Sequence, residues 1–245
     1  MKKLTKSAKN FFTFFWQTVA VILWTLVIGI FVFPVNCVLK PGKIYLKLAR
    51  LWCRGLMLIG GVSVQSIGLQ NIDPNATHLL VSNHKSHFDL VALIYLFPKP
   101  FFAVAKRSLF YIPVFGWNLF LAGHIMVNRD NIPSTRRVLR RVEGALREGR
   151  SVIIFPEGKR NPEPQNGLLP FKNGAFWVAK RAQAPILPLA IIGSENVLPI
   201  NSLTIARGKI ILKAGEPIFT DEQISVETLS EKARLSIEKM LDDEV

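Results

Sequence analysis

The chain has 245 residues, of which 49% are hydrophobic, and its formal net charge at pH 7 is +14. This length suits one α/β domain with an appendage and argues against two full domains. No acidic residue precedes Asp73, so the N-terminal part is basic and free of acid. Such a segment favours an anionic partner, either a membrane surface or a nucleic acid.

The first predicted helix is suited to a membrane. Phe11 to Phe33 is almost entirely apolar and long enough to cross the roughly 30 Å hydrocarbon core of a bilayer, and Pro34 is expected to end the helix. The apolar part of a signal peptide has roughly 7 to 15 residues, and no small-residue cleavage site follows here, so a cleaved signal is disfavoured. Cys37 and Cys53 lie in this apolar part of the chain, and we expect free thiols in a reducing compartment.

The second predicted helix, from Lys43 to Gly60, is amphipathic. Its charged residues recur at helical spacing on one stripe: Lys43, Lys47, Arg50 and Arg54. Apolar residues fill the other positions, a pattern typical of a helix that lies in the membrane interface. Because lysines flank the first helix on both sides, positive charge gives no crossing direction. We therefore favour a membrane-associating helical hairpin over residues 1–60, held in one leaflet, over a single crossing helix.

Beyond Gly61 the composition becomes that of a globular α/β domain, which we place at residues 61–245. Seven apolar runs are predicted strands: Val62–Ile67, His78–Ser82, Phe101–Ala105, His124–Asn128, Ser151–Phe155, Ile186–Ile192 and Lys209–Ala214. The clearest predicted helices are Phe88–Phe97, Ile132–Glu148, Asn173–Gln183 and Val226–Leu241. This alternation predicts a largely parallel or mixed sheet of about seven strands flanked by helices.

A histidine and a carboxylate follow the second predicted strand. Ser86 and Asp89 have the spacing of an N-cap and an acidic N3 residue, so the next helix should begin at Phe88 or just before it. His84 then lies outside the helix, at the carboxyl end of a strand, where open α/β sheets usually bind ligands. Asp89 can reach back to the His84 ring.

Such a pair suits general-base catalysis, because the carboxylate fixes the tautomer and stabilises the imidazolium. The spacing alone is equally consistent with a helix cap and a histidine bonded to a loop. A metal site of His84, His87 and Asp89 is disfavoured, since no further His, Cys or acidic cluster completes the ligand set.

A second polar cluster, Glu157-Gly158-Lys159-Arg160, follows the strand that ends at Phe155. Gly158 allows close approach of a ligand to the backbone, and nearby cations suit a phosphate. The cationic candidates are Lys106, Arg129, Lys159, Arg160 and Lys172. A solvated basic turn, or a surface ion pair of Arg129, explains the same residues without a ligand.

Four segments resemble, in order, the motifs of the glycerolipid acyltransferases, and most closely the bacterial 1-acyl-glycerol-3-phosphate enzymes. They are Asn83-His84-x4-Asp89, Gly123-x5-Arg129, Phe155-Pro156-Glu157-Gly158-x-Arg160 and Ile186-Leu187-Pro188-Leu189-Ala190. The resemblance covers about 61–217; the first and third motifs are specific, and the other two would be weak alone. Lys159 departs from the Thr or Ser common in this family, which we do not expect to disable the enzyme.

The resemblance implies transfer of a fatty acyl group to the sn-2 hydroxyl of lysophosphatidate, without a covalent acyl-enzyme or a bound cofactor. His84 would be the general base and Asp89 its orienting partner. The residues implied to hold the glycerol and phosphate of the acceptor are Arg129, Glu157, Gly158 and Arg160. Pro188 would belong to a strand that shapes the site. The acyl donor would be acyl-CoA or acyl carrier protein, and we expect the cytoplasmic face of the cell inner membrane as location.

Other acceptors and other classes of protein are the alternatives to this function. The acceptor could be another lysolipid or glycerol 3-phosphate, or the chain could be a non-catalytic, basic membrane-binding protein. Nucleic-acid binding is disfavoured because the charge is interleaved with apolar residues, and a serine hydrolase because no G-x-S-x-G motif occurs.

Two further groups of residues have open interpretations. One helix carries a row of arginines: Arg136, Arg137, Arg140, Arg141 and Arg147. Its basic face suits a CoA phosphate, an acidic acyl carrier protein, a lipid headgroup or solvent equally well. Phe115, Trp117 and Phe120 are candidates to line an acyl tunnel, although core packing is their commoner use.

Overall fold

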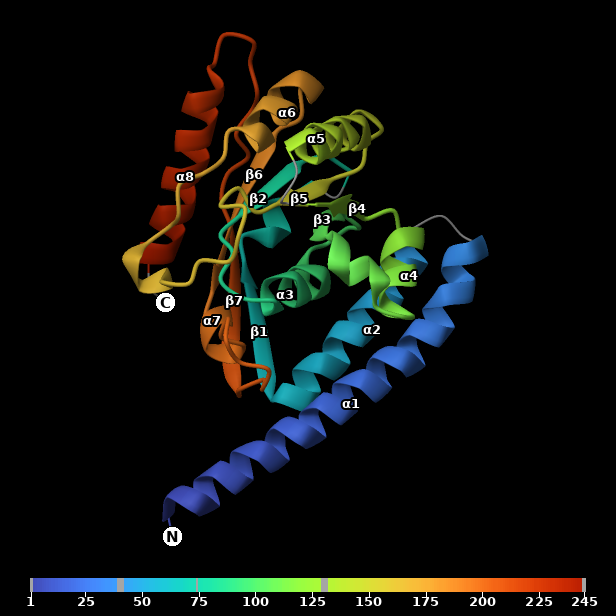
Figure 1. Ribbon diagram of the computed structural model, residues 1–245. Helices are drawn as coiled ribbons and strands as arrows, with labels where there is room; N and C mark the ends of the chain where they lie inside the picture. Colours follow the sequence, from blue (N-terminus) through green and yellow to red (C-terminus); the bar gives the residue numbers. More distant parts are fainter. Residues whose placement is uncertain (1, 39–41, 74, 129–131, 244–245) are drawn as a thin grey trace.

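The sheet of this protein has seven strands in the order β1-β7-β6-β2-β5-β3-β4 (Figure 1). The computed structural model describes residues 2–38, 42–73, 75–128 and 132–243. The strands are β1 (Val62–Ile67), β2 (Leu79–Ser82), β3 (Phe102–Lys106), β4 (Ile125–Val127), β5 (Val152–Ile154), β6 (Ile186–Ile192) and β7 (Gly208–Ala214). Every neighbouring pair is parallel except β6 and β7. The predicted mixed, mostly parallel sheet is therefore confirmed, with each strand within one or two residues of its predicted bounds.

Helices cover both faces of the sheet. The helices are α1 (Lys2–Val38), α2 (Lys43–Gly60), α3 (Phe88–Leu96), α4 (Phe115–Leu121), α5 (Ile132–Arg147), α6 (Gly174–Ala182), α7 (Ser194–Val197) and α8 (Val226–Asp242). Short 3-10 turns lie at Leu69–Asn71, Arg107–Tyr111 and Pro164–Asn166. Alternate residues of β2 face opposite sides: Leu80 packs in the core with α2 and α3, while Leu79 and Val81 pack with α5, α6 and α8. Two cores thus sandwich the sheet.

The first helix, α1, is longer than predicted, because it continues past Pro34 to Val38. The prediction that Pro34 ends the helix was wrong by one turn. Pro34 has no N–H to donate to the Ile30 carbonyl, so α1 loses one backbone hydrogen bond there, and a tertiary contact holds the last turn. Asn36 is buried there and donates through its side-chain nitrogen to Oδ1 of Asn118 at 3.0 Å.

Residues 12–38 of α1 form one segment that is long and apolar enough to cross a membrane, with a mean hydropathy of 2.5. Most of this segment is exposed, for example Phe12 at 63%, Ile30 at 62% and Phe31 at 66%. The helix nevertheless packs on α2, as Figure 1 shows. An uncovered apolar surface of this size makes membrane association plausible.

Two tryptophans join α1 to α2. The indole nitrogen of Trp24 donates to the Trp52 carbonyl at 2.9 Å, and that of Trp52 donates to Oγ1 of Thr25 at 3.1 Å. Gly55 makes this approach possible, since a Cβ there would lie 2.0 Å from Nε1 of Trp24. The predicted pair of N-terminal helices is confirmed, and its two cysteines, Cys37 and Cys53, are free.

Candidate active site

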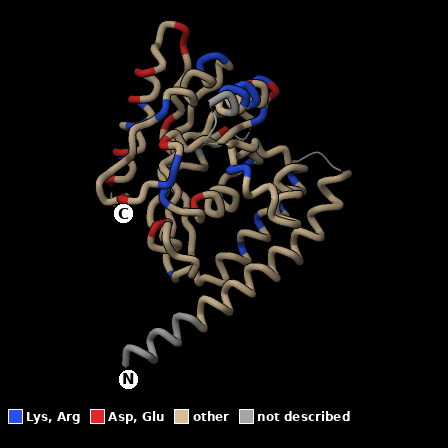
Figure 2. The backbone as a smooth tube through the Cα atoms, viewed as in Figure 1, with Lys and Arg blue, Asp and Glu red and all other residues tan. Residues whose placement is uncertain are grey.

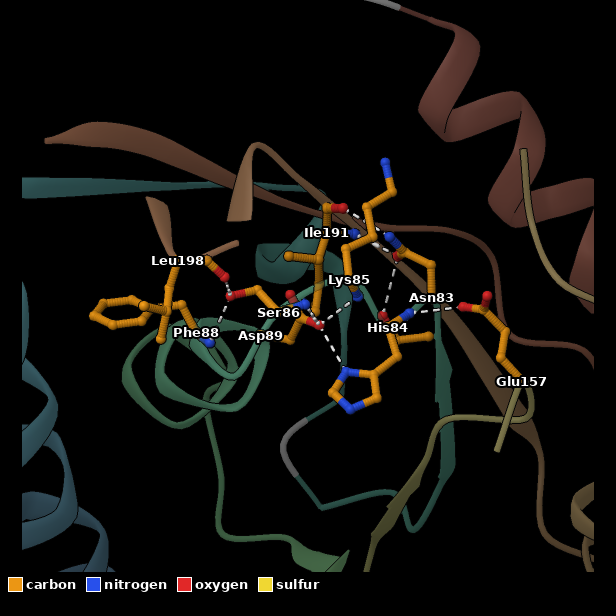
Figure 3. Close-up of polar contacts among 10 residues, drawn as sticks. Asn83, His84, Lys85, Ser86, Phe88, Asp89, Glu157, Ile191 and Leu198 are labelled. Carbon is orange, nitrogen blue, oxygen red and sulfur yellow. Dashed lines mark hydrogen bonds and ion pairs between the residues drawn. The ribbon is translucent and has the colours of Figure 1, made fainter. Parts of the chain in front are cut away.

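The site begins at Asn83, the residue that directly follows β2. Its side chain continues the pairing of β2 with β6: Nδ2 donates to the Ile191 carbonyl and Oδ1 accepts from the Ile191 N–H, both at 2.8 Å (Figure 3). A side chain thereby makes the two bonds that a further strand residue would make through its backbone. The main chain after Asn83 is released to form the turn that carries His84.

Asp89, on the first turn of α3, holds that turn together. Its Oδ2 accepts from Nδ1 of His84 at 2.8 Å and from the backbone N–H groups of Lys85 at 2.8 Å and Ser86 at 2.9 Å (Figure 3). The side chain of Asp89 is fully buried. The predicted contact between Asp89 and the His84 ring is therefore present in the structure. Because Nδ1 donates to the carboxylate, the lone pair of the neutral imidazole lies on Nε2.

The helix begins at Phe88, as predicted, but the cap differs from the prediction. His87 occupies the N-cap position, and Ser86 lies one residue further out. The Ser86 hydroxyl accepts from the Phe88 N–H at 3.2 Å and donates to the Leu198 carbonyl at 2.8 Å. Ser86 therefore ties the turn to the loop after β6 as well as starting α3.

The His84 residue is held from its other side by the segment that follows β5. Its ring stacks on Phe155 with centroids 4.0 Å apart. The backbone N–H of His84 donates to Oε1 of Glu157 at 2.8 Å, and the backbone carbonyl of His84 accepts from the Asn161 N–H at 2.8 Å. The ring and main chain of His84 are thus fixed, while 10% of its side chain is exposed.

Glu157 is buried and uses both carboxylate oxygens on backbone groups. Oε1 accepts from His84 and Oε2 accepts from the Leu169 N–H at 3.1 Å. Burial raises the pKa of this carboxyl above its ordinary value, while the two backbone N–H groups oppose the rise. The carboxylate joins the His84 turn to the segment between β5 and α6.

Gly158 has a positive φ of 74°, which disfavours any residue with a Cβ. A Cβ would also lie 2.8 Å from both Cε and Nζ of Lys172. The Lys172 ammonium therefore rests on the Glu157-Gly158 turn, and the Lys172 N–H donates to the Pro156 carbonyl at 2.9 Å. The structure thus brings His84, Asp89, Glu157, Gly158 and Lys172 together.

The other candidate residues are less closely placed. Lys106, at the end of β3, and Lys159 are exposed, and Arg160 is half-buried. Within the described ranges no hydrogen bond or ion pair joins these three side chains to the His84 turn. Arg129 lies outside the described residues. Among the described residues, no group of three or more His, Cys, Asp or Glu is arranged to hold a metal ion.

One part of the site was missed from the sequence, the segment after β6. Glu195 pairs with Lys85 at 3.1 Å, and Leu198 accepts from Ser86 as described above. Glu195 is 110 residues from Lys85 in the chain. Glu195 lies just beyond the carboxyl end of a predicted strand, and this position was the signal that could have placed Glu195 at the site. Strands β6 and β2 are parallel, so they end at the same edge of the sheet.

An apolar cavity of about 450 Å³ lies between the N-terminal helices and the sheet. His87 and Phe88 form part of its wall beside the His84 turn, and Val91 and Ile94 continue that wall along α3. Of the three aromatic candidates, only Phe115 lines this cavity; Trp117 and Phe120 are 51% and 70% exposed. Trp117 and Phe120 therefore neither line this cavity nor pack in the core.

The cavity wall includes a hydrogen-bonded pair of titratable side chains, Tyr45 and His124. Nδ1 of His124 accepts from the Ala103 N–H at 3.0 Å, so Nε2 of the neutral ring donates to the Tyr45 oxygen, also at 3.0 Å. Burial lowers the pKa of His124 to about 4 and raises that of Tyr45. Both groups are neutral at physiological pH.

The arrangement described so far defines an α/β protein in which a carboxylate-oriented histidine lies beside an apolar cavity. A family described as Acyltransferase matches residues 63–192, which include the His84 turn and the Glu157 segment. The chain therefore belongs to the acyltransferase family.

Individual relatives agree with this assignment. A 1-acyl-sn-glycerol-3-phosphate acyltransferase of Chlamydomonas reinhardtii is 31% identical over 185 residues, 72% of this chain and 55% of that protein. The enzyme of that name from Saccharomyces cerevisiae is 28% identical over 195 residues, 79% of this chain and 64% of that protein. The chain thus spans less than two thirds of either relative.

A solved structure shares the fold of the whole chain. It is the 1-acyl-sn-glycerophosphate (LPA) acyltransferase of Thermotoga maritima, which matches with a TM-score of 0.83. The match covers 99% of this chain and 97% of that chain at 22% identity. The two N-terminal helices therefore belong to a fold already known.

Proposed function

We propose that the protein transfers a fatty acyl group from an acyl thioester to the sn-2 hydroxyl of 1-acyl-glycerol-3-phosphate, giving phosphatidic acid. The observation that carries this proposal is the His84–Asp89 pair beside the apolar cavity. The pair supplies a base for a hydroxyl, and the cavity can take a hydrocarbon chain. The names of the relatives support lysophosphatidate as the acceptor.

In the proposed mechanism, Nε2 of His84 accepts the proton of the sn-2 hydroxyl as the oxygen attacks the thioester carbonyl. Asp89 stabilises the imidazolium that forms, because its charge lies 2.8 Å from Nδ1. When the tetrahedral intermediate collapses, the carbon–sulfur bond breaks and the thiolate takes the proton back from the imidazolium. General-base assistance of this kind contributes about 10²–10⁴-fold. No covalent acyl-enzyme and no bound cofactor takes part.

Cationic residues at the same edge of the sheet would bind the acceptor's phosphate. Lys172 supports this role best, since its ammonium rests on the Glu157-Gly158 turn beside His84. The remaining proposed cations are Lys106, Arg129, Lys159 and Arg160. Glu157 and Gly158 would shape the turn on which the glycerol phosphate lies.

The membrane surface is the proposed place of reaction, because lysophosphatidate and its product carry acyl chains that are costly to bring into water. We propose that residues 1–60 form the membrane-associating hairpin, held in one leaflet on the cytoplasmic face of the inner membrane, and that residues 61–245 form the acyltransferase domain. Acyl-CoA or acyl carrier protein would supply the acyl group. Glycerol 3-phosphate and other lysolipids are the alternative acceptors.

A direct assay tests the proposal. Purified protein in detergent or lipid is given 1-acyl-glycerol-3-phosphate with acyl-CoA or acyl carrier protein, and phosphatidic acid is measured. We expect His84→Ala to lose at least about 10²-fold in kcat. His78→Gln is the matched control, because His78 lies at the other end of β2, where its N–H bonds Oγ of Ser151. Equal rates for wild type and His84→Ala would refute the mechanism.

A further inference from the structure

Helix α5 presents an arginine surface, defined here as its exposed residues Arg136, Arg137, Arg140 and Arg141. Their spacing places them in two adjacent rows along the helix, since residues four apart lie one above the other. The opposite face of α5 packs into the core through Val138, Val142, Ala145 and Leu146. The arginines are therefore not needed to hold the helix on the sheet.

In the described part of the chain, no acidic side chain pairs with the arginine surface. The first acidic residue of α5 is Glu143, which is buried and bonds Arg147 and Arg181. Among the described residues, no ion pair involves any of the four arginines. Four uncompensated cations on one helix make a strong positive field outside it.

The basic stripe of α2 has a different character. Its exposed cations, including Lys43 and Lys47, alternate with exposed apolar residues such as Ile44 and Leu51. In α5, no large apolar side chain is exposed along the described part of the helix. The α2 stripe has the composition of a membrane interface, whereas the arginine surface has that of a surface in contact with water.

The position of α5 supports the same distinction. Helices α1 and α2 lie on one side of the sheet, and the blue band of α5 lies on the other (Figures 1 and 2). If the N-terminal hairpin contacts the membrane, as proposed above, the arginine surface is on the side of the sheet away from the hairpin. Its partner would then be soluble and anionic.

The helix that carries the arginine surface begins at the same edge of the sheet as the candidate active site. Strands β2, β5, β3 and β4 are parallel, so their carboxyl ends share one edge of the sheet. His84 follows β2 at this edge, and α5 begins at Ile132, shortly after β4 ends at Val127. A partner docked on the arginines would therefore lie beside the edge where the thioester must be delivered.

We propose that the arginine surface docks an acidic acyl carrier protein, which then delivers its acyl thioester to His84. The inference rests on the proposed function and identifies its donor. Rows of cations on the convex face of a helix match rows of carboxylates on another protein, while a small ligand such as CoA is usually held in a concave site.

Donor competition tests the inference. Wild type, Arg136→Glu/Arg140→Glu and Arg137→Glu/Arg141→Glu are assayed with palmitoyl-acyl carrier protein and with palmitoyl-CoA. For each double variant we expect the KM for the carrier-protein donor to rise by about tenfold or more, with a steeper loss at low salt. The KM and kcat with palmitoyl-CoA stay unchanged, which also shows that the variants fold. Lys232→Glu/Lys239→Glu on α8 changes the charge equally and leaves both donors unaffected.

Several outcomes would overturn the inference. Equal rises in KM for both donors would assign the arginines to a phosphate of the smaller substrates, and unchanged values would exclude them from donor binding. Weaker binding of the variants to phosphatidylglycerol vesicles would assign the arginines to the membrane. Wild-type protein active with palmitoyl-CoA alone would leave the acyltransferase function standing and refute docking, whereas inactivity with both donors would refute the proposed function itself.

Discussion

Replacing Glu157 with glutamine separates two possible roles of this residue. The motif resemblance implies that Glu157 holds the acceptor. In the structure its two oxygens accept from the N–H groups of His84 and Leu169. Glutamine has one oxygen, so it can keep only one of these bonds, and its NH₂ group faces the other N–H. The variant therefore perturbs the main chain of His84 without changing the size of the side chain.

The size of the effect follows from the lost contact. A hydrogen bond to a charged group contributes about 1.5–3 kcal/mol, and the donor left behind is buried. Part of this loss is offset, because the raised pKa of Glu157 shows that burial penalises its ionised form. We expect the free energy of unfolding to fall by about 2 kcal/mol. If this energy holds His84 in its reactive position, kcat falls by about 30-fold.

Steady-state kinetics with varied lysophosphatidate distinguish the two roles. A positioning role lowers kcat and leaves the KM for lysophosphatidate unchanged, whereas a substrate contact made equally in ground and transition states raises KM. Glu163→Gln is the matched control, since Glu163 is an exposed glutamate in the same segment between β5 and α6. An unchanged kcat with a raised KM would refute the positioning argument.

Three further predictions concern other parts of the molecule. Gly158→Ala should raise the KM for lysophosphatidate and cost about 1–2 kcal/mol of stability, because it strains a φ of 74° and displaces Lys172; unaltered kinetics and stability would contradict this. Since the pKa of folded His124 is about 4, below its ordinary value, the unfolded chain binds the proton first as pH falls. The free energy of unfolding should thus fall by up to about 3 kcal/mol between about pH 6.5 and pH 4. Chemical denaturation of His124→Gln should show a smaller fall over the same pH range, and a profile identical to that of the wild type would contradict this prediction. A single cysteine introduced at Lys2, in a background without Cys37 and Cys53, should react with an impermeant thiol reagent from only one side of sealed vesicles. This should be the side from which a single cysteine placed at the exposed Glu163 of the globular part also reacts; labelling from the opposite side would establish a crossing helix.

Local patterns in the sequence were enough to predict most of the fold. The strands β1 and β6 have their predicted bounds, and α2 ends inside the glycine pair Gly60-Gly61. Both results depend on nearby residues: apolar residues alternating with polar ones in β1, an uninterrupted apolar run in β6, and a left-handed Gly61 that closes α2. The extension of α1 beyond Pro34 depends instead on Asn118, which is distant in the sequence.

The candidate site also combines contacts that local sequence predicts with contacts that depend on the order of the strands. The contact between His84 and Asp89 spans five residues and was predictable from helix-start signals. The use of both Glu157 oxygens on backbone groups, and the pairing of Glu195 with Lys85, depend on which strands are neighbours in the sheet. Periodicity indicates that a strand exists but does not specify the strand beside it.

Gln17 connects the membrane-suited helix to the candidate site. It interrupts the apolar surface of α1, and its side chain makes two hydrogen bonds to Ile205, donating to the carbonyl at 2.9 Å and accepting from the N–H at 3.0 Å. The segment that ends at Ile205 begins at the end of β6, and it includes Glu195 and Leu198, which hold the His84 turn. A change in the position of α1 relative to the sheet would therefore act on the turn that carries the proposed base. This linkage gives a physical role to the amide side chain of Gln17 in the apolar part of α1.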